Sequence, residues 1–347
     1  MNLIKPKRLV PNDMVALLSP SWGGPSRFPH VFDLGIKNLI SKFDLRVKEF
    51  PTARMDAEVT YQNPRLRAED INAAFTDPEV AAIITSIGGD DSVRILPFLD
   101  LELILQNPKI FMGFSDTAAI NCFLNSKGLI TYNGPSNMAG FAQLDNVSPG
   151  ATDHIREILF EAPDKYPFQP YPEWSDKYIS WDTAGYSGET SEKISNSEGW
   201  HWLQGSGIVQ GRLFGGCIEV LEFLKGTQFW PDHDFLRGSI LFFETSEDKP
   251  TVSSVKYFLR NYGSMGLLDS IGGILFGRAR SYSEAEKIEL DKMIVQIVAG
   301  EFGRSDMPIL TNLDFGHTDP QWIMPLGVKA EVDCKNKSLS LCEAPTT

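Results

Sequence analysis

The chain has 347 residues, 42% hydrophobic and 22% charged, a composition typical of a globular protein rather than a disordered one. Its length exceeds the usual size of a single hydrophobic core, so we expect two domains. The net charge of −13 and the pI near 4.9 argue against a nucleic acid partner, because phosphate backbones are bound by clustered Lys and Arg.

The apolar runs of the chain are short. The first run after the charged N-terminal stretch covers only residues 14–18, which is too short for the core of a signal peptide. No run approaches the roughly 18 apolar residues that a membrane-spanning helix needs. We therefore expect a soluble, cytoplasmic protein with no membrane partner.

The spacing of cysteine and histidine predicts neither disulfides nor a metal site. There is no CxxC, HxxxH or HxH pattern in the sequence. We expect no metal and no cofactor, and we interpret the cysteines as reduced structural thiols in a reducing compartment. The four cysteines are Cys122, Cys217, Cys334 and Cys342.

The first half of the chain alternates short apolar strands with amphipathic helices. The expected elements, in chain order, are a strand at 14–18, a helix at 31–41, a strand at 45–49, a helix at 65–75, a strand at 80–86, a short helix at 92–99, a strand at 110–113 and a helix at 118–124. Such alternation predicts an α/β domain with parallel strands covered by helices on both faces. Ligands of such sheets bind where strands end and helices begin, which singles out the turns SIGGDDS at 86–92 and GFSDT at 113–117.

From about residue 150 the pattern changes. Prolines, polar residues and aromatics without periodicity predict an extended connection up to about 205, with or without a short hairpin, of the kind that serves as a lid or binding loop. A second α/β unit then follows. Its expected strands are 239–244, 272–276, 309–313, 329–333 and 338–341, and its expected helices are 253–262 and 285–298. The predicted organisation is a domain at 1–150, a connecting segment at 151–206 and a domain at 207–347.

Ser115 is a candidate nucleophile. It follows the predicted strand Ile110–Gly113 and precedes a predicted helix, so a tight turn would present its hydroxyl outward beside free amides at the helix start. The alternative is that Ser115, Asp116 and Thr117 only cap the helix, which is the usual role of these residue types. The second glycine of a GxSxG motif is absent, so local pattern alone leaves both interpretations open.

Gly88 and Gly89 leave the backbone of the neighbouring turn open to a ligand. Their amides could donate to an oxyanion or a carboxylate, and with Asp90 they are candidate substrate contacts. The alternative is a tight turn followed by an Asp cap.

Glu244 and His317 are the remaining candidates. Glu244 ends the apolar strand that starts at Ser239, where a carboxylate could orient an imidazole. His317 follows the strand Ile309–Leu313 in the constrained loop LDFGHTDPQW, where it could act as a general base. The alternatives are a solvated acid at a strand end and an exposed loop histidine.

Five segments, SIGGDDSVRIL, FMGFSDTAAI, GRLFGGCIEVL, ILFFETSED and FGHTDPQWIMPLG, resemble in order and spacing the LD-carboxypeptidase family of serine peptidases, which includes the microcin C immunity peptidases. The resemblance runs from about residue 12 to 333. It implies a Rossmann-like N-terminal domain, a homodimer, and a catalytic triad of Ser115, Glu244 and His317. The amides of Gly89 and Asp116 would form the oxyanion hole.

The segment SEGWHWLQGSG at 197–207 is more similar to the microcin C immunity branch than to the murein-recycling branch. We therefore expect a peptidyl or aminoacyl nucleotide as substrate, with the L,D amide of a murein tetrapeptide as the alternative. A non-catalytic ligand-binding module is a third hypothesis, although the turn SPSWGGPS after the first strand does not fit GxGxxG. Among the tryptophans of the connection, Trp181 is the predicted contact for a nucleobase.

Overall fold

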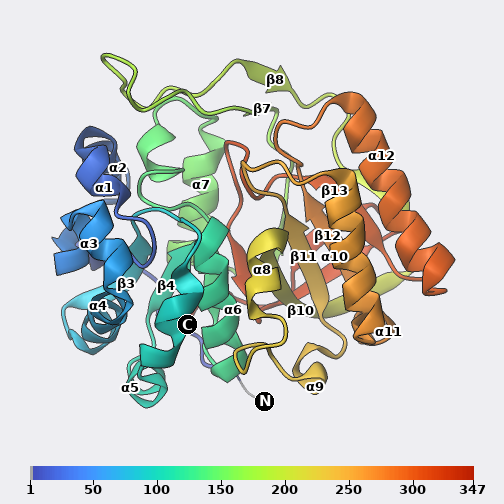
Figure 1. Ribbon diagram of the computed structural model, residues 1–347. Coiled ribbons are helices and arrows are strands. Elements are labelled where there is room, and N and C mark those ends of the chain that lie inside the picture. The colour runs from blue at the N-terminus through green and yellow to red at the C-terminus, as the bar shows by residue number, and fades with distance from the viewer. Residues whose placement is uncertain (1–2) are drawn as a thin grey trace.

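The computed structural model describes residues 3–347, and two β-sheets lie side by side in it, with a small hairpin across the top (Figure 1). Within these residues, no helix combines the length and the apolar character needed to cross a membrane. Both sheets carry helices, so the predicted α/β class is confirmed.

The first sheet has six strands. Their order is β14 (Met324–Leu326), β5 (Thr131–Asn133), β4 (Ile110–Gly113), β3 (Val80–Thr85), β1 (Met14–Leu18) and β2 (Arg46–Glu49). All neighbours pair in parallel except β14, which is antiparallel to β5. The central strands are continuous apolar runs because a parallel sheet is covered on both faces.

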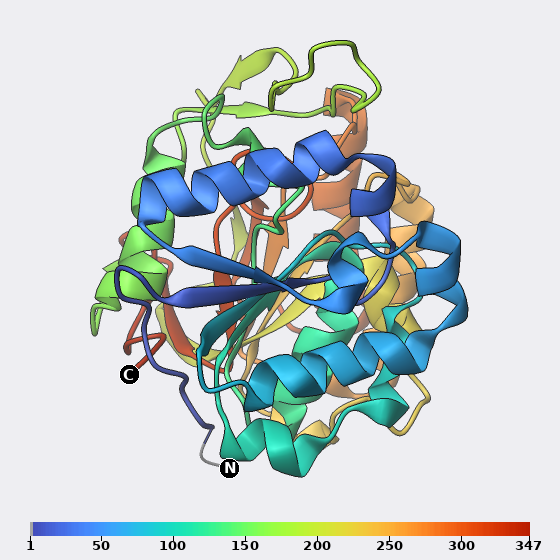
Figure 2. The ribbon, with the colours of Figure 1, turned by 90° about the vertical axis from the view of Figure 1, so that its left-hand side faces the viewer.

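Helices cover both faces of this sheet. Figure 2 shows α2 (Pro29–Phe43) above the sheet and α4 (Pro64–Thr76) below it. Helix α2 begins with Pro at its first position and ends at Asp44, which has a left-handed backbone. The other helical segments of this half are α1 (Gly24–Arg27), a 3₁₀ turn (Pro51–Arg54), α3 (Ala57–Gln62), a 3₁₀ helix (Ser92–Phe98), α5 (Leu101–Gln106), a 3₁₀ turn (Ser115–Thr117), α6 (Ala118–Lys127), a 3₁₀ turn (Phe141–Gln143), and α7 (Gly150–Arg156) with its π-helical continuation (Glu157–Glu161).

The second sheet has eight strands. Their order is β6 (Tyr166–Pro167), β16 (Ser338–Leu341), β15 (Lys329–Asp333), β10 (Ile208–Cys217), β11 (Ile240–Glu244), β12 (Gly273–Gly277), β13 (Ile309–Leu313) and β9 (His201–Gln204). Strands β10 to β13 are parallel to one another, and the flanking pairs are antiparallel. Its helices are α8 (Ile218–Leu224), α9 (His233–Leu236), α10 (Val252–Ser264), α11 (Leu267–Ser270) and α12 (Glu284–Val295), which continues as a π-helix (Gln296–Glu301).

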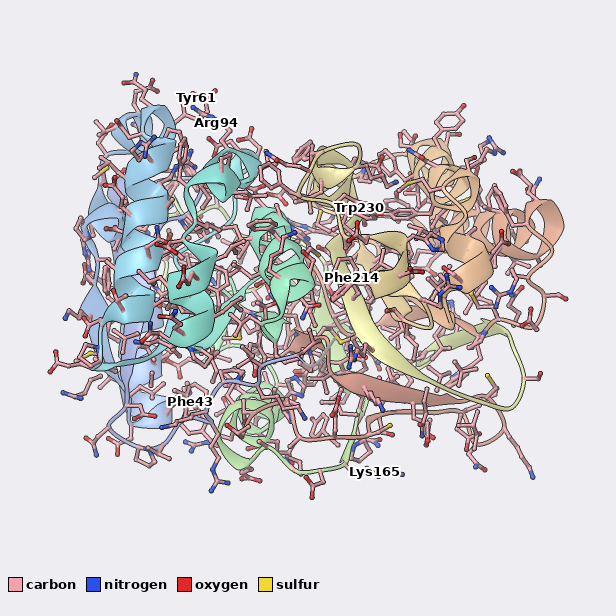
Figure 3. The ribbon with its side chains drawn as sticks, turned by 90° about the horizontal axis from the view of Figure 1, so that it is seen from below. Phe43, Tyr61, Arg94, Lys165, Phe214 and Trp230 are labelled. Atoms are coloured by element: carbon pink, nitrogen blue, oxygen red, sulfur yellow. The ribbon has the colours of Figure 1, made fainter. Side chains whose placement is uncertain are left out.

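Aromatic side chains fill this second half. Viewed from below in Figure 3, Phe214 of β10 and Trp230 lie close together, with their rings at 90° and 6.5 Å between centroids. In the first half, Arg94 lies over the ring of Tyr61 at 4.9 Å from its centroid (Figure 3).

Helix α6 lies between the two sheets, next to α8 (Figure 1), so the two halves share an apolar boundary.

Strands cross the boundaries expected at residues 150 and 206. Strand β14, from the C-terminal part of the chain, completes the first sheet, while β6 and β9, from the connection, form the two edges of the second sheet. The rest of the connection includes a hairpin of β7 (Glu173–Ser175) and β8 (Lys193–Ser195). The chain is therefore interwoven at three points, and the connection is partly a structural element of the second half.

Candidate active site

Ser115 lies at the carboxyl end of β4, at the start of the 3₁₀ turn that leads into α6. Its φ angle is 58°, in the left-handed region that side chains other than glycine rarely adopt. A residue held in this conformation between a strand and a helix has its side chain turned out of the sheet edge. Ser115 is half-buried and lines a cavity of about 290 Å³.

Gly88 allows the neighbouring turn to approach this serine. A Cβ atom at Gly88 would stand 2.9 Å from the Ser115 Cβ, 3.0 Å from its Oγ and 3.4 Å from the Asp116 nitrogen. Any side chain at residue 88 would therefore displace the serine. The SIGGDDS and GFSDT turns, which end adjacent parallel strands, meet at this contact.

Gly89 has a φ angle of 154°, and a Cβ there would meet the Ser21 Oγ at 2.2 Å. Its amide donates no hydrogen bond within the described residues. The Asp116 amide lies near Gly88, as described above. Both predicted oxyanion donors thus belong to the two turns that meet at Ser115, and this arrangement can present amides to a developing negative charge.

The Asp116 carboxylate ties the two turns together. It accepts hydrogen bonds from the Ser21 hydroxyl (2.6 Å) and from the amides of Asp91 (3.0 Å) and Ser92 (2.7 Å). The side chain is fully buried, and burial raises its pKa while these donors lower it, with a net rise. The sequence had suggested only a backbone role or a helix cap for Asp116, so this function of its side chain is new.

A buried ion pair supports the same turn from below. Arg67 on α4 donates two hydrogen bonds to the Asp91 carboxylate, at 2.7 and 2.8 Å, and Arg94 donates a third at 2.7 Å. Burial acts to raise the pKa of Asp91, but the two guanidinium groups outweigh it and lower the pKa. The turn that carries Gly88 and Gly89 is therefore held from the helix layer as well as from Asp116.

His317 and Glu244 lie together, although they are far apart in the chain. The His317 Nδ1 is 2.6 Å from the Glu244 Oε2, and both side chains are buried. Gly316 has a φ angle of 100°, and a Cβ there would stand 2.6 Å from the Glu244 Cβ. The glycine before the histidine thus gives the carboxylate room beside the imidazole.

A second carboxylate, not expected from the sequence, faces the other nitrogen of the ring. The Glu247 Oε2 lies 3.1 Å from the His317 Nε2. Burial lowers the pKa of His317, but the two glutamates more than compensate and raise it to about 10. In return the imidazole contact lowers the pKa of Glu247 to about 2. The free protein at neutral pH therefore holds an imidazolium between two carboxylates.

The cavity joins these parts. Its lining combines Ser115 and His317 with glycines and aromatic side chains from both halves of the chain and from the connection. The lining residues are Trp22, Phe28, Ile87, Gly88, Gly89, Phe114, Ser115, Ala139, Tyr178, Ile179, Ser180, Trp181, Glu247 and His317. The carboxyl ends of β1, β3 and β4 all open into this cavity, as expected for a doubly wound sheet.

Of the predicted substrate contacts, Gly88, Gly89 and Trp181 line the cavity, whereas Asp90 is exposed and is not among the lining residues. Sequence reasoning missed Trp22, Phe28, Phe114, Tyr178 and Glu247. Trp22 and Phe114 each follow a strand of the first sheet closely, so the rule that ligands bind at strand ends could have identified them. Glu247 and Tyr178 carry no comparable signal.

Residues 15–134 match the profile of the LD-carboxypeptidase N-terminal domain, and residues 210–332 match that of the LD-carboxypeptidase C-terminal domain. The chain belongs to the LD-carboxypeptidase family. This assignment confirms the resemblance seen in the sequence, and it identifies the protein as a serine-type carboxypeptidase.

Relatives within the LD-carboxypeptidase family differ in what their names describe. The microcin C7 self-immunity protein of Escherichia coli is 30% identical over 280 residues, which cover 80% of this chain and 78% of that protein. A Bacillus subtilis protein described as a "probable murein peptide carboxypeptidase" is 25% identical over 338 residues, covering 96% and 93%.

A solved structure of a microcin C7 self-immunity protein in complex with aspartyl sulfamoyl adenosine superposes with a TM-score of 0.87. The sequence identity is 26%, and the match covers 99% of this chain and 100% of the other. This similarity confirms the expected fold, a parallel-sheet N-terminal domain joined to a second domain with a sheet and helices.

The cysteines of this LD-carboxypeptidase and its buried His154 do not line the cavity that holds Ser115 and His317. The four cysteines are free thiols. His154 is buried, accepts a hydrogen bond from the Ile323 amide at 2.7 Å, and has its pKa lowered to about 3 by burial. Over residues 3–347, no group of three or more His, Cys, Asp or Glu side chains is arranged to hold a metal ion.

Proposed function

We propose that this enzyme hydrolyses the amide bond at the carboxyl end of an aminoacyl or peptidyl nucleotide through a triad of Ser115, His317 and Glu244. The observation that carries the proposal is the composition of one cavity. Ser115 and His317 line it together with a row of aromatic rings, so that groups suited to acyl transfer lie beside a surface suited to a nucleobase.

In the first step, the His317 Nε2 accepts the proton of the Ser115 hydroxyl, and the Oγ forms a bond to the carbonyl carbon of the terminal amide. The carbonyl π electrons move onto oxygen, where the amides of Gly89 and Asp116 donate hydrogen bonds to the resulting oxyanion. Glu244 accepts the Nδ1 hydrogen, holds the ring in one tautomer and stabilises the imidazolium.

In the second step, the carbon–nitrogen bond breaks, and His317 returns its proton to the departing nitrogen. The acyl group now forms an ester with Ser115. A water molecule then gives a proton to His317 and attacks the ester carbonyl, and the Ser115 oxygen leaves and recovers the proton. The products are a free carboxylate and a free amine or phosphoramide nitrogen, and no cofactor enters the balance.

Three aromatic rings of the cavity support the proposal that the leaving group, which departs through its nitrogen, is a nucleotide. Phe28 contacts Trp22 and Trp181 edge to face, at centroid distances of 6.1 and 5.3 Å. A second hollow of about 450 Å³ shares Phe28 and Trp181 with the first cavity. Stacking of a base on such a ring is worth about 1–3 kcal/mol, and the similar structure with aspartyl sulfamoyl adenosine agrees with this assignment.

A murein peptide is the second candidate substrate, since the Bacillus subtilis relative named for that activity matches almost the whole chain. The two substrates make different demands on the cavity. A tetrapeptide has no planar base, so its binding does not depend on Trp181.

The test is to incubate the pure protein in parallel with an aspartyl adenylate linked through a hydrolysable phosphoramide and with murein tetrapeptide, and to identify the products by mass spectrometry. The Ser115→Ala variant should lose on the order of a millionfold in turnover while its melting temperature stays the same. Ser253→Ala, which alters an exposed serine of α10 that does not line the cavity, is the control and should retain activity.

Retention of more than a tenth of the activity by Ser115→Ala would rule out this serine as the nucleophile. Labelling of Ser115 by a fluorophosphonate, competed by substrate, would separate a peptidase from a binding module. The homodimer implied by the family resemblance and the cytoplasmic location expected from the sequence stay predictions, and sedimentation equilibrium would test the first of them.

A further inference from the structure

Glu247 occupies the side of the His317 ring that the proposed reaction needs. Its Oε2 lies 3.1 Å from Nε2, the nitrogen that would accept the Ser115 proton. Nε2 has a single in-plane position, which holds either a hydrogen or a lone pair. While a hydrogen on Nε2 faces the Glu247 carboxylate, the ring cannot act as the base for Ser115.

The two glutamates at the ring differ in how firmly they are fixed. The Glu244 side chain is completely buried, whereas the Glu247 side chain is 54% exposed. The Glu247 contact is close enough for an ion pair, but Nε2 has no aligned hydrogen-bond partner within residues 3–347. The exposed Glu247 side chain can therefore rotate away from the ring when a cationic group of a ligand replaces the imidazolium as its partner.

The charge of the cavity indicates what that partner would be. No Lys or Arg lines it, and Glu247 is its one acidic lining residue within the described chain. The other charged groups near the ring are Glu244, the buried Asp319, and Arg280, which interacts electrostatically with both Asp319 and Glu247. A carboxylate in an apolar, aromatic cavity is complemented by a cation on the ligand.

We propose that Glu247 selects substrates with a free ammonium group on the carbon next to the scissile carbonyl, and that this ammonium draws Glu247 away from His317, so that the Nε2 proton passes to solvent water and Nε2 can then accept the Ser115 proton. The inference rests on the proposed function and narrows it to aminoacyl substrates with a free α-amine. An acylated α-nitrogen, as in a peptidyl substrate, carries no charge and would leave the Glu247 contact in place.

The reach of the groups fits this assignment. An α-nitrogen lies roughly 2.5 Å from its own carbonyl carbon, and that carbon must approach the serine oxygen to about 3–3.5 Å before attack. Glu247 contacts His317, which is the proposed base for Ser115. One rotation of the Glu247 side chain therefore brings its carboxylate to the ammonium group.

The first experiment follows the His317 ring by NMR in protein with the Ser115→Ala change, which prevents turnover. L-Alaninamide, which has an ammonium group, should lower the pKa of His317, whereas the neutral isostere propanamide should leave it unchanged. Adding Glu247→Gln should lower that pKa by about one unit or more without any ligand, and alaninamide should then have no further effect. The matched control is Asp248→Asn, which removes a charge from the same exposed turn but does not line the cavity.

An unchanged His317 pKa in the Glu247→Gln protein, or equal effects of alaninamide and propanamide, would overturn the inference.

The second experiment compares an aminoacyl adenylate phosphoramide with its N-acetyl form. The kcat/KM ratio of the free to the acetylated substrate should fall tenfold or more in Glu247→Gln and stay the same in Asp248→Asn. An unchanged ratio in Glu247→Gln would also overturn it. Failure of the wild-type enzyme to hydrolyse either compound would count against the proposed function, and the NMR result would still decide the role of Glu247.

Discussion

Gly88 and Ser115 are so close that the serine side chain occupies the space in which a Cβ at residue 88 would need to fit, with 2.9 Å between that position and the Ser115 Cβ. We expect Gly88→Ala to reduce kcat at least a hundredfold, because a displacement of about 1 Å at a reacting group can cost that much. The measurement is steady-state kinetics together with thermal unfolding. Gly150→Ala, where a Cβ would meet nothing closer than 3.6 Å, controls for the loss of a glycine elsewhere in the same protein.

Glu244 and His317 should behave as one functional unit. His317→Ala and the double variant with Glu244→Gln are expected to have nearly equal residual activity, because removing the carboxylate matters little once the imidazole is gone. A double-mutant cycle on kcat/KM measures this. Losses that add would argue that Glu244 only stabilises the fold.

The pH dependence follows from the charge on His317. The base must be neutral to accept a proton, and the glutamates raise its pKa to about 10 in the free enzyme, so the protonated form dominates at neutral pH. We therefore expect kcat/KM for an N-acetylated substrate, which has no ammonium group that titrates in this range, to rise with pH through the neutral range towards pH 10. A raised pKa also means that the ion pairs stabilise the fold fully below pH 6.5 and lose this effect as the pH passes 10. A kcat/KM that falls between pH 7 and 9 in a stable protein would contradict this assignment.

Trp181 should matter for a nucleotide and not for a peptide. Trp181→Ala is expected to weaken binding of an aspartyl adenylate about tenfold, which corresponds to about 1.4 kcal/mol, and to leave turnover of a murein peptide nearly unchanged. Trp181→Phe keeps an aromatic face and should restore most of the affinity. Equal losses on both substrates, or no loss on either, would favour murein recycling.

The buried pair of Arg67 and Asp91 should stabilise the protein more than a surface pair does. Arg67→Met removes a fully buried cation and leaves Asp91 with Arg94 alone, so we expect a loss of about 3–5 kcal/mol in the free energy of unfolding. Arg54→Met is the control, since Arg54 pairs with Glu49 and Asp33 at the surface and its loss should cost about 1 kcal/mol or less. Denaturant unfolding of both variants tests this comparison.

The sequence predicted the elements whose pattern is local. The strands Ile110–Gly113, Lys329–Asp333 and Ser338–Leu341 have the expected bounds, because each is a short run of strand-forming residues bounded by turns. The two-residue β6 and the three-residue β14 were not predicted, since strands this short have no periodicity and exist only through their partners. The pairing of β14 with β5 depends on tertiary contacts that no sequence window contains.

In the candidate site, too, the sequence indicates features with a local pattern and misses contacts that form only in the folded chain. Ser115, Glu244 and His317 each end or follow a strand, so their positions could be inferred, and their proximity followed from the family resemblance. The contact between Glu247 and His317 could not be inferred, because an acid in an exposed turn looks like any solvated side chain in sequence. Trp200, unlike Trp181, packs against the second half of the chain, where its indole donates to the buried Asp314 at 2.8 Å.

Strand β14 comes from the C-terminal part of the chain but pairs in the first sheet, and this has a consequence for biosynthesis. A ribosome makes Ser115 and the whole of β1 to β5 long before it makes residue 324, so the nascent N-terminal half waits with the edge of β5 unpaired. The Tyr132 hydroxyl likewise lacks its acceptor, the carbonyl of Pro345, until that residue emerges. The half that carries Ser115 therefore cannot complete its fold until residues 324–345 have been made.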